Sequence, residues 1–484
     1  MIRAAICAIA FACAAGAPTA RAGEEAHAHW TVSTTDPKAQ SAFDRGVAML
    51  YAFDAGEARV AFESAAERDP NLAIAYWGMA EADTIDINRP STPEGETRGA
   101  AAAAKARAHA SHASAEERTL IDAIGRRYGR GSQKQKFARY ADALSAFTKT
   151  RRDEPNALVI TAFAIYNAED VLLDGKDALT PKAREMLDDL DRALVLEPAN
   201  LGAHHLRIHL LENAKRAKDA VSDADALSSY AYPPGESHLP HMAGHIWSRT
   251  GDYERLVTDN EVAVANDKSW FALGDGPGQQ YMRIYHDHDV DFVLYGLTTI
   301  GRDADARAAA KDEGATQRVH VALRLHDDAA VLAEPKASDW VRAFAAGRSG
   351  QTSQARALLP KVTDRVRRHL VEAAIAQGAK DRDAAVAAYA AAYAATKSDF
   401  QGDPKDYWET PIGEGYGAAL LAAGKPAEAE TVFNAELVRF PNDPHLEWGL
   451  SQALAAQHKD DAAAKAAYHA HWKGAADLTL DRLG

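Results

Sequence analysis

The sequence contains almost no cysteine. Its two cysteines, Cys7 and Cys13, both lie within the first 22 residues of a 484-residue chain. The remaining residues can therefore form no disulfide and offer no thiolate to a metal. Stability must come from a hydrophobic core. Any metal would be bound by His, Asp and Glu side chains, which suit a divalent transition metal such as Zn, Cu(II), Fe or Mn.

Long apolar runs are also missing. The run from residue 4 to residue 15 is too short to span a membrane, and no later stretch is long and apolar enough to do so. This first run follows Arg3 and precedes Ala20-Arg21-Ala22, which fits the small-residue rule for signal-peptidase cleavage. We therefore predict a signal peptide at residues 1–22, cleaved near Ala22, and a periplasmic or secreted protein without a membrane span.

Basic residues are too few to balance the acidic ones. The chain has 55 Lys and Arg against 69 Asp and Glu, a net charge of −14, and removal of Arg3 and Arg21 with the signal peptide would make it −16. Because nucleic-acid binding depends on neutralising phosphates with Lys and Arg, this balance argues against a nucleic-acid partner.

The alternation of β-branched and polar residues that marks strands is almost absent, and only 19 residues are proline. Alanine is used heavily instead. This composition is typical of a helical protein, and a helical chain of this length calls for a search for internal repeats.

A repeat of about 34 residues is clearest near the two ends of the chain. In the first copy Gly46 is followed at fixed spacings by Ala58, Phe62, Ala65 and Pro70. This is the spacing of the tetratricopeptide repeat (TPR), in which small residues let two helices approach and the proline ends the second. The residues in the same phase near the other end are Gly417, Ala429, Phe433 and Pro441.

The repeat predicts an all-α fold, a TPR-type α-solenoid over residues 39–484 with about eight to ten helix pairs. Resemblance to TPR proteins implies that antiparallel pairs stack into a right-handed superhelix. We expect a flexible N-terminal arm at residues 23–38 and an irregular insert near 85–113. A capping-box pattern, Ser114-Ala115-Glu116-Glu117, predicts a helix start directly after the insert.

Histidines and carboxylates recur at helical spacing between residues 201 and 292. In TPR proteins the concave groove is lined by the first helix of each pair, chiefly at repeat positions 2, 5, 9 and 12. Phasing on Pro198, Gly244 and Gly301 places eight ligand-type side chains at such positions. These are His205, His209, Glu212, His238, His241, His245, His288 and Asp291.

Further carboxylates near these positions are candidates for orienting the imidazoles, since a histidine ligand needs an acceptor for its other ring nitrogen. The candidates are Glu169, Asp170, Asp287 and Asp289. His204 and His286 fall off the groove positions, so we expect them to lie outside the site.

Two functions fit this pattern. The first is a transition-metal site in the groove, which would activate water or dioxygen if a coordination position stayed open. The second is a metal-free scaffold that binds a peptide or protein partner in the concave groove and releases it as the histidines protonate. No sequence motif names a reaction, and the oligomeric state is open.

The chain resembles a family of bacterial exported TPR proteins through four signatures. These are Ala75-Tyr76-Trp77-Gly78, the helix from His204 to Glu212, the helix from His238 to His245, and the run from Gly417 to Leu421. The resemblance implies the fold and leaves the activity open. It also implies a histidine where this chain has Asp291, a hard-metal ligand that would shift metal preference.

Overall fold

A computed structural model describes residues 28–84, 92–169, 171–174, 178–212, 216–274, 279–396 and 407–483. Over these ranges the chain is all-α, and the only β pairing is an isolated bridge between Leu173 and Leu179. The predicted signal peptide, the candidate Asp170, the first part of the predicted arm (23–27) and the first part of the predicted insert (85–91) lie outside the described residues.

Twenty-four α-helices are described, and most pack against the helices that precede and follow them in the chain. The N-terminal helices are α1 (Pro37–Tyr51), α2 (Ala55–Arg68), α3 (Ala73–Ala82), α4 (Pro93–Ala108), α5 (Ala115–Arg127), α6 (Gln133–Thr148), α7 (Pro155–Ala168) and α8 (Pro181–Leu196). The central helices are α9 (Leu201–Leu211), α10 (Val221–Ser228), α11 (His238–Thr250), α12 (Tyr253–Phe271) and α13 (Gln279–Thr299).

The C-terminal helices continue the series from α14 to α24. They are α14 (Asp303–Lys311), α15 (Ala315–Arg324), α16 (Asp328–Ala333), α17 (Asp339–Arg348), α18 (Thr352–Leu358), α19 (Arg365–Gly378), α20 (Arg382–Thr396), α21 (Ile412–Ala422), α22 (Pro426–Arg439), α23 (Pro444–Ala456) and α24 (Ala462–His471). Four short 3₁₀ turns are η1 (Ala110–His112), η2 (Ala217–Ala220), η3 (Leu359–Lys361) and η4 (Leu480–Arg482).

Local sequence signals set several helix starts. Asp36 caps α1 by accepting from the Lys38 backbone N–H, and Pro37 follows at the first helical position, where its missing N–H costs nothing. The capping box predicted at Ser114 and Glu117 is present at the start of α5, with both reciprocal hydrogen bonds formed.

The helix pairs pack as the repeat spacing predicts. Phe62 on α2 lies against Gly46 on α1 and Gly78 on α3, where an added Cβ would come within 2.5 and 2.6 Å of its ring. Phe433 on α22 lies in the same way between Gly417 on α21 and Gly449 on α23. Because only glycine permits such close approach, these contacts fix the TPR-type pairing at both ends of the solenoid.

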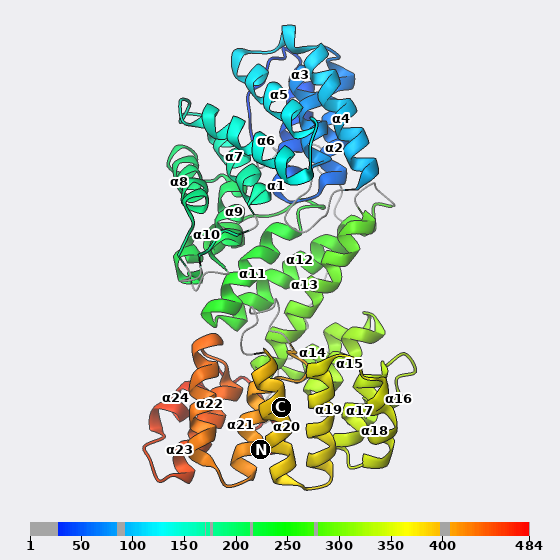
Figure 1. The fold of residues 1–484 in the computed structure, drawn as a ribbon, viewed down its shortest axis with the longest axis vertical. Coiled ribbons are helices and arrows are strands. Elements are labelled where there is room, and N and C mark those ends of the chain that lie inside the picture. The colour runs from blue at the N-terminus through cyan, green and yellow to red at the C-terminus, as the bar shows by residue number, and fades with distance from the viewer. Residues whose placement is uncertain are drawn as a thin grey trace, which may run out of the picture.

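Both ends of the array touch its central helices. At one end the Tyr51 carbonyl, at the close of α1, accepts from the His205 ring on α9. At the other, the Pro441 carbonyl accepts from the Tyr253 hydroxyl on α12, and the Lys473 N–H donates to the Ile300 carbonyl after α13. Figure 1 shows α11–α13 between the N-terminal helices and the C-terminal ones. The central helices are therefore covered from two sides.

Two stretches outside the clearest repeats have defined structure. The described part of the N-terminal arm lies against the first helices, because Trp30 meets the Trp77 ring edge-on at 5.6 Å and Asp44 accepts from the Trp30 N–H. In the insert near 85–113, the described residues include a regular helix, α4, because the alanine-rich sequence favours one. Among the helices described, none has the length and apolarity needed to cross a bilayer.

Candidate metal centre

The first cluster of the site consists of three buried histidines from two helices. His205 and His209 lie one turn apart on α9, and His238 is the first residue of α11. Each offers one nitrogen, and the three nitrogens all lie within 4.8 Å of one another. The spacing of four residues places the first two imidazoles on one face of α9, and the crossing of α11 brings the third against them.

The nitrogens of this first triad are poorly satisfied by the protein. The Nδ1 of His205 donates to the Tyr51 carbonyl at 2.6 Å, which leaves its Nε2 as a lone-pair donor. This Nε2, the Nε2 of His209 and both ring nitrogens of His238 are buried without a hydrogen-bond partner. Leaving buried polar atoms unpaired costs roughly 1–3 kcal/mol each. One nitrogen from each of the three rings lies close to the other two, which is the arrangement expected of metal ligands.

Burial also keeps these imidazoles neutral. Loss of solvent, followed by the charge of neighbouring histidines, holds the pKa of His205 and that of His238 well below the usual range for histidine. Neutral imidazoles at pH 7 retain the lone pair that a metal requires.

Phe53 covers the first triad. Its ring centroid lies 4.4 Å from that of His205, 5.5 Å from His209 and 5.4 Å from His238. The backbone of Phe53 has a φ of 58°, a left-handed conformation that is rare for an aromatic residue. Gly251 and Gly424 take similar φ values, and each stands seven residues after its repeat glycine, as Phe53 does. Phe53 thus keeps a strained backbone at a position where its ring covers the three histidines.

A second triad adjoins the first and comprises His241 and His245 on α11 and His288 on α13. Its three ligand nitrogens also lie within 4.8 Å of one another. The ring of His238 lies 5.7 Å from that of His241, so the two triads are neighbours along α11. Phe292 packs edge-on against His241 and His288 and stacks on His245.

Hydrogen bonds fix the proton positions in this second triad. The Asn260 amide donates to the Leu256 carbonyl, so its oxygen faces His241 and must accept from Nδ1 at 2.8 Å. The Nδ1 of His245 lies 2.6 Å from Glu212 Oε2, which accepts its proton. When both rings are neutral, both Nε2 atoms carry lone pairs, and they face each other at 2.8 Å. Two lone pairs repel at this distance unless a cation or a shared proton lies between them.

Glu212 links the two triads. Its Oε2 contacts His245 of the second triad, and its Oε1 lies 3.4 Å from the Nδ1 of His209 in the first. Burial alone would raise the pKa of Glu212. The charge of His245 and hydrogen bonds from both histidines outweigh burial and hold this pKa well below its usual range. Glu212 is therefore an ionised carboxylate whose two oxygens are both directed to imidazole Nδ1 atoms.

The remaining candidates are distributed unevenly. Asp289 is fully buried with Oδ1 2.9 Å from the Nδ1 of His241. Asp291 instead points to His320, whose Nδ1 is 3.6 Å away, because it lies on α13 most of a turn beyond His288. Asp287 is exposed, and Glu169 is the residue that caps the C-terminal end of α7. The structure thus brings six histidines, Glu212 and Asp289 together and leaves Asp291, Asp287 and Glu169 outside.

The two histidines expected to lie outside the site do so. His204 pairs with Asp223 at 2.7 Å, and His286 pairs with Asp267 at 3.1 Å. The predicted concave groove is covered at the first triad, because the end of α1 and Phe53 lie over the histidines of α9. We did not predict from the sequence that Asn260 belongs to the site, although its repeat position is unusual. Asn260 stands sixteen residues after Gly244, and the clearest repeats have phenylalanine at this position, Phe62 and Phe433.

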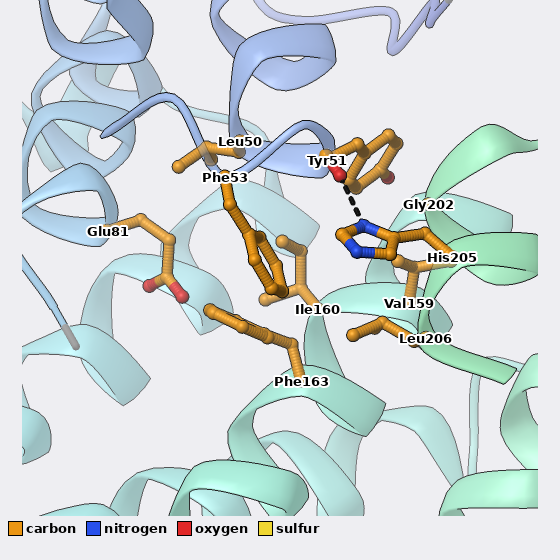
Figure 2. A pocket seen from close by; sticks show the side chains of 10 residues that line it. All are labelled: Leu50, Tyr51, Phe53, Glu81, Val159, Ile160, Phe163, Gly202, His205 and Leu206. Atoms are coloured by element: carbon orange, nitrogen blue, oxygen red, sulfur yellow. Dashed lines mark hydrogen bonds between the residues drawn. The ribbon is translucent and has the colours of Figure 1, made fainter. Parts of the chain in front are cut away.

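A small cavity adjoins the first triad, with an empty volume of about 300 Å³. Figure 2 shows His205 at one side of it and Glu81 at the other, with the rings of Phe53 and Phe163 between them. Most of its wall is aliphatic or aromatic. Burial raises the pKa of Glu81 to about 7, although Tyr140 donates a hydrogen bond to its Oε2 at 2.6 Å.

Comparison with known proteins assigns the chain to no family. No family model matches the sequence, and no curated protein does. Among solved structures, it is similar to the TPR domain of P58(IPK), at 14% identity over 87% of this chain and 98% of that one, with a TM-score of 0.24. It is also similar to yeast Tom70, at 11% identity over 90% of this chain and 85% of that one, with a TM-score of 0.23. The class, an all-α TPR-type solenoid, follows from the helix pairs and their glycine–phenylalanine contacts described above.

Proposed function

We propose that this chain is an exported bacterial TPR-type protein that binds a divalent transition metal in its buried histidine cluster. The ligands are drawn from His205, His209 and His238 and from His241, His245 and His288. Imidazole ligands in a closed, helical pocket suit Zn, Cu or Fe better than the oxygen-seeking Mg or Ca.

The observation that carries the proposal is the facing pair of Nε2 atoms. The Nδ1 protons of His241 and His245 are held by Asn260 and Glu212, so both Nε2 lone pairs meet at 2.8 Å in a buried site. A bound cation relieves this repulsion. The unpartnered nitrogens of the first triad support the same conclusion.

The site suits chemistry on a small molecule. Three protein ligands leave a coordination position open, and a metal held in this way supplies an activated water or binds dioxygen. The cavity beside His205 is small and mostly apolar, which favours such a reactant over a bulky or charged one. Phe53 and Phe292 exclude bulk water from the histidines, and this strengthens the electrostatic interactions within the pocket.

Metal analysis of the mature protein, purified without a histidine tag, tests the proposal. We expect stoichiometric transition metal in the wild type and its loss in the double variant His205→Ala, His241→Ala. The matched control, His286→Ala with His471→Ala, removes two histidines paired elsewhere with Asp267 and Glu447 and should keep the metal. Metal retained in the first variant, or absent from the wild type, would contradict the proposal.

A second candidate, the peptide or protein scaffold, is favoured by a different surface. A cavity of about 470 Å³ in the C-terminal half is lined by alanine and leucine side chains, by the basic residues Arg348, Lys380 and Arg382, and by Asp381 and Asp481. Arg348 Nη1 is buried without a hydrogen-bond partner. The scaffold hypothesis thus points to a peptide with an acidic group for Arg348 at this cavity rather than to the histidines. A pull-down from periplasmic extract at neutral pH that recovered no partner would count against it.

A further inference from the structure

We propose that the histidine cluster binds two metal ions, one in each triad, and that Glu212 is no ligand but the carboxylate that positions both triads. The inference rests on the proposed metal-binding function and concerns the stoichiometry and internal design of the same site. It differs from the sequence-based expectation, in which Glu212 was itself a ligand.

The geometry of the nitrogens favours two ions over one. At a metal–nitrogen distance of about 2.0–2.1 Å, the six nitrogens around one ion would all lie within roughly 4.2 Å of one another. The six imidazoles do not form a single group even at 4.8 Å; they separate into two groups of three. Three nitrogens are also the usual protein complement of a four-coordinate site with an open position.

The proton positions indicate that Glu212 accepts hydrogen bonds from the ligand histidines of both sites and does not contact the metals. Histidine ligands bind a metal through one nitrogen and donate the proton of the other to an acceptor, often a carboxylate. Glu212 supplies one oxygen to His245 at 2.6 Å and the other to His209 at 3.4 Å, in both cases at Nδ1. This leaves the Nε2 of each ring for a metal. A carboxylate with both oxygens engaged in this way has none to spare for coordination.

The local charge also fits two ions. Two buried cations so close together repel strongly unless negative charge lies between or beside them. Glu212, an ionised carboxylate in contact with a histidine of each triad, supplies this charge. The Tyr51 carbonyl and the Asn260 amide oxygen add two oriented dipoles at His205 and His241.

The first measurement is the ratio of metal to protein in the reconstituted wild type, by elemental mass spectrometry after titration with Zn²⁺ and desalting. We expect two ions per chain, one in either His209→Ala or His288→Ala, and none when both changes are combined. A ratio of one in the wild type overturns the inference while leaving the proposed function intact. A ratio of zero overturns both.

The second measurement separates the two roles of Glu212. In Glu212→Gln, loss of the carboxylate at two Nδ1 atoms should weaken Zn²⁺ binding at both sites by about 10- to 100-fold, with two ions still bound at saturation. The control is Asp259→Asn, a buried carboxylate that accepts from Trp247 and Ser228 and should leave affinity unchanged. Loss of one full equivalent at saturating Zn²⁺ in Glu212→Gln would identify Glu212 as a ligand and overturn its positioning role.

Discussion

Single residues at this site adopt states that an ordinary helical core avoids. Phe53 keeps a left-handed backbone at a position where two other repeats have Gly251 and Gly424, and His205, His209 and His238 have buried ring nitrogens with no hydrogen-bond partner. Each such feature costs roughly 1–3 kcal/mol. The unpaired nitrogens of three adjoining rings are the strongest residue-level argument for a ligand at the first triad.

Glu81 makes stability depend on pH. Its pKa is raised to about 7 by burial, so the folded state prefers the neutral acid while the unfolded chain ionises near its ordinary value of 4.5. The unfolded state therefore gains stability relative to the folded state as pH rises from about 4.5 to about 7, by about 3 kcal/mol in all.

The variant Glu81→Gln removes this titration and keeps an acceptor for the Tyr140 hydroxyl. We expect it to become more stable relative to the wild type between pH 4.5 and pH 7.5, measured as the difference in thermal-unfolding midpoint at the two pH values. Burial also raises the pKa values of Asp54 and Glu236, but both residues are present in the variant and the wild type, so their contributions cancel in the comparison. If the difference in unfolding midpoint between the variant and the wild type is the same at both pH values, the raised pKa of Glu81 is contradicted.

At the scale of helices, the repeat spacing was enough to predict the fold and much of the site. The glycine and phenylalanine positions predicted the helix pairs, and their phase separated six histidines from His204 and His286. The phase could not show that α1 folds over α9, because this contact joins residues about 150 positions apart. It also misplaced Asp291, because one residue more or less along α13 turns a side chain by about 100°.

Asn260 is where the packing of a helix pair and the site meet. It lies against Gly244, as Phe62 lies against Gly46, and also accepts from His241. We expect Asn260→Leu, which has a similar shape but no acceptor, to weaken Zn²⁺ binding by about 10- to 100-fold. Asn260→Asp keeps the acceptor and should bind nearly as tightly. Competition titration with a chelator measures the Zn²⁺ affinity of each variant. Equal affinity in Asn260→Leu and Asn260→Asp would show that Asn260 does not support a metal ligand.

At the scale of the whole molecule, a solenoid that would otherwise expose a groove is closed at its centre. Contacts from the end of α1 and from the loop before α23 cover the central helices, which carry the histidines. Closure converts a surface suited to extended peptides into an interior pocket suited to an ion and a small molecule. The C-terminal half has a second cavity, so the two proposed functions concern different parts of the chain.

The central claim, that these histidines bind a transition metal, is tested most directly by X-ray absorption spectroscopy on the untagged protein. We predict a metal edge with nitrogen neighbours at about 2.0–2.1 Å and the outer-shell scattering of several imidazoles per metal. This imidazole signal should disappear in the double variant His205→Ala, His241→Ala. A first shell made of oxygen without imidazole scattering, or no metal edge at all, would contradict the account.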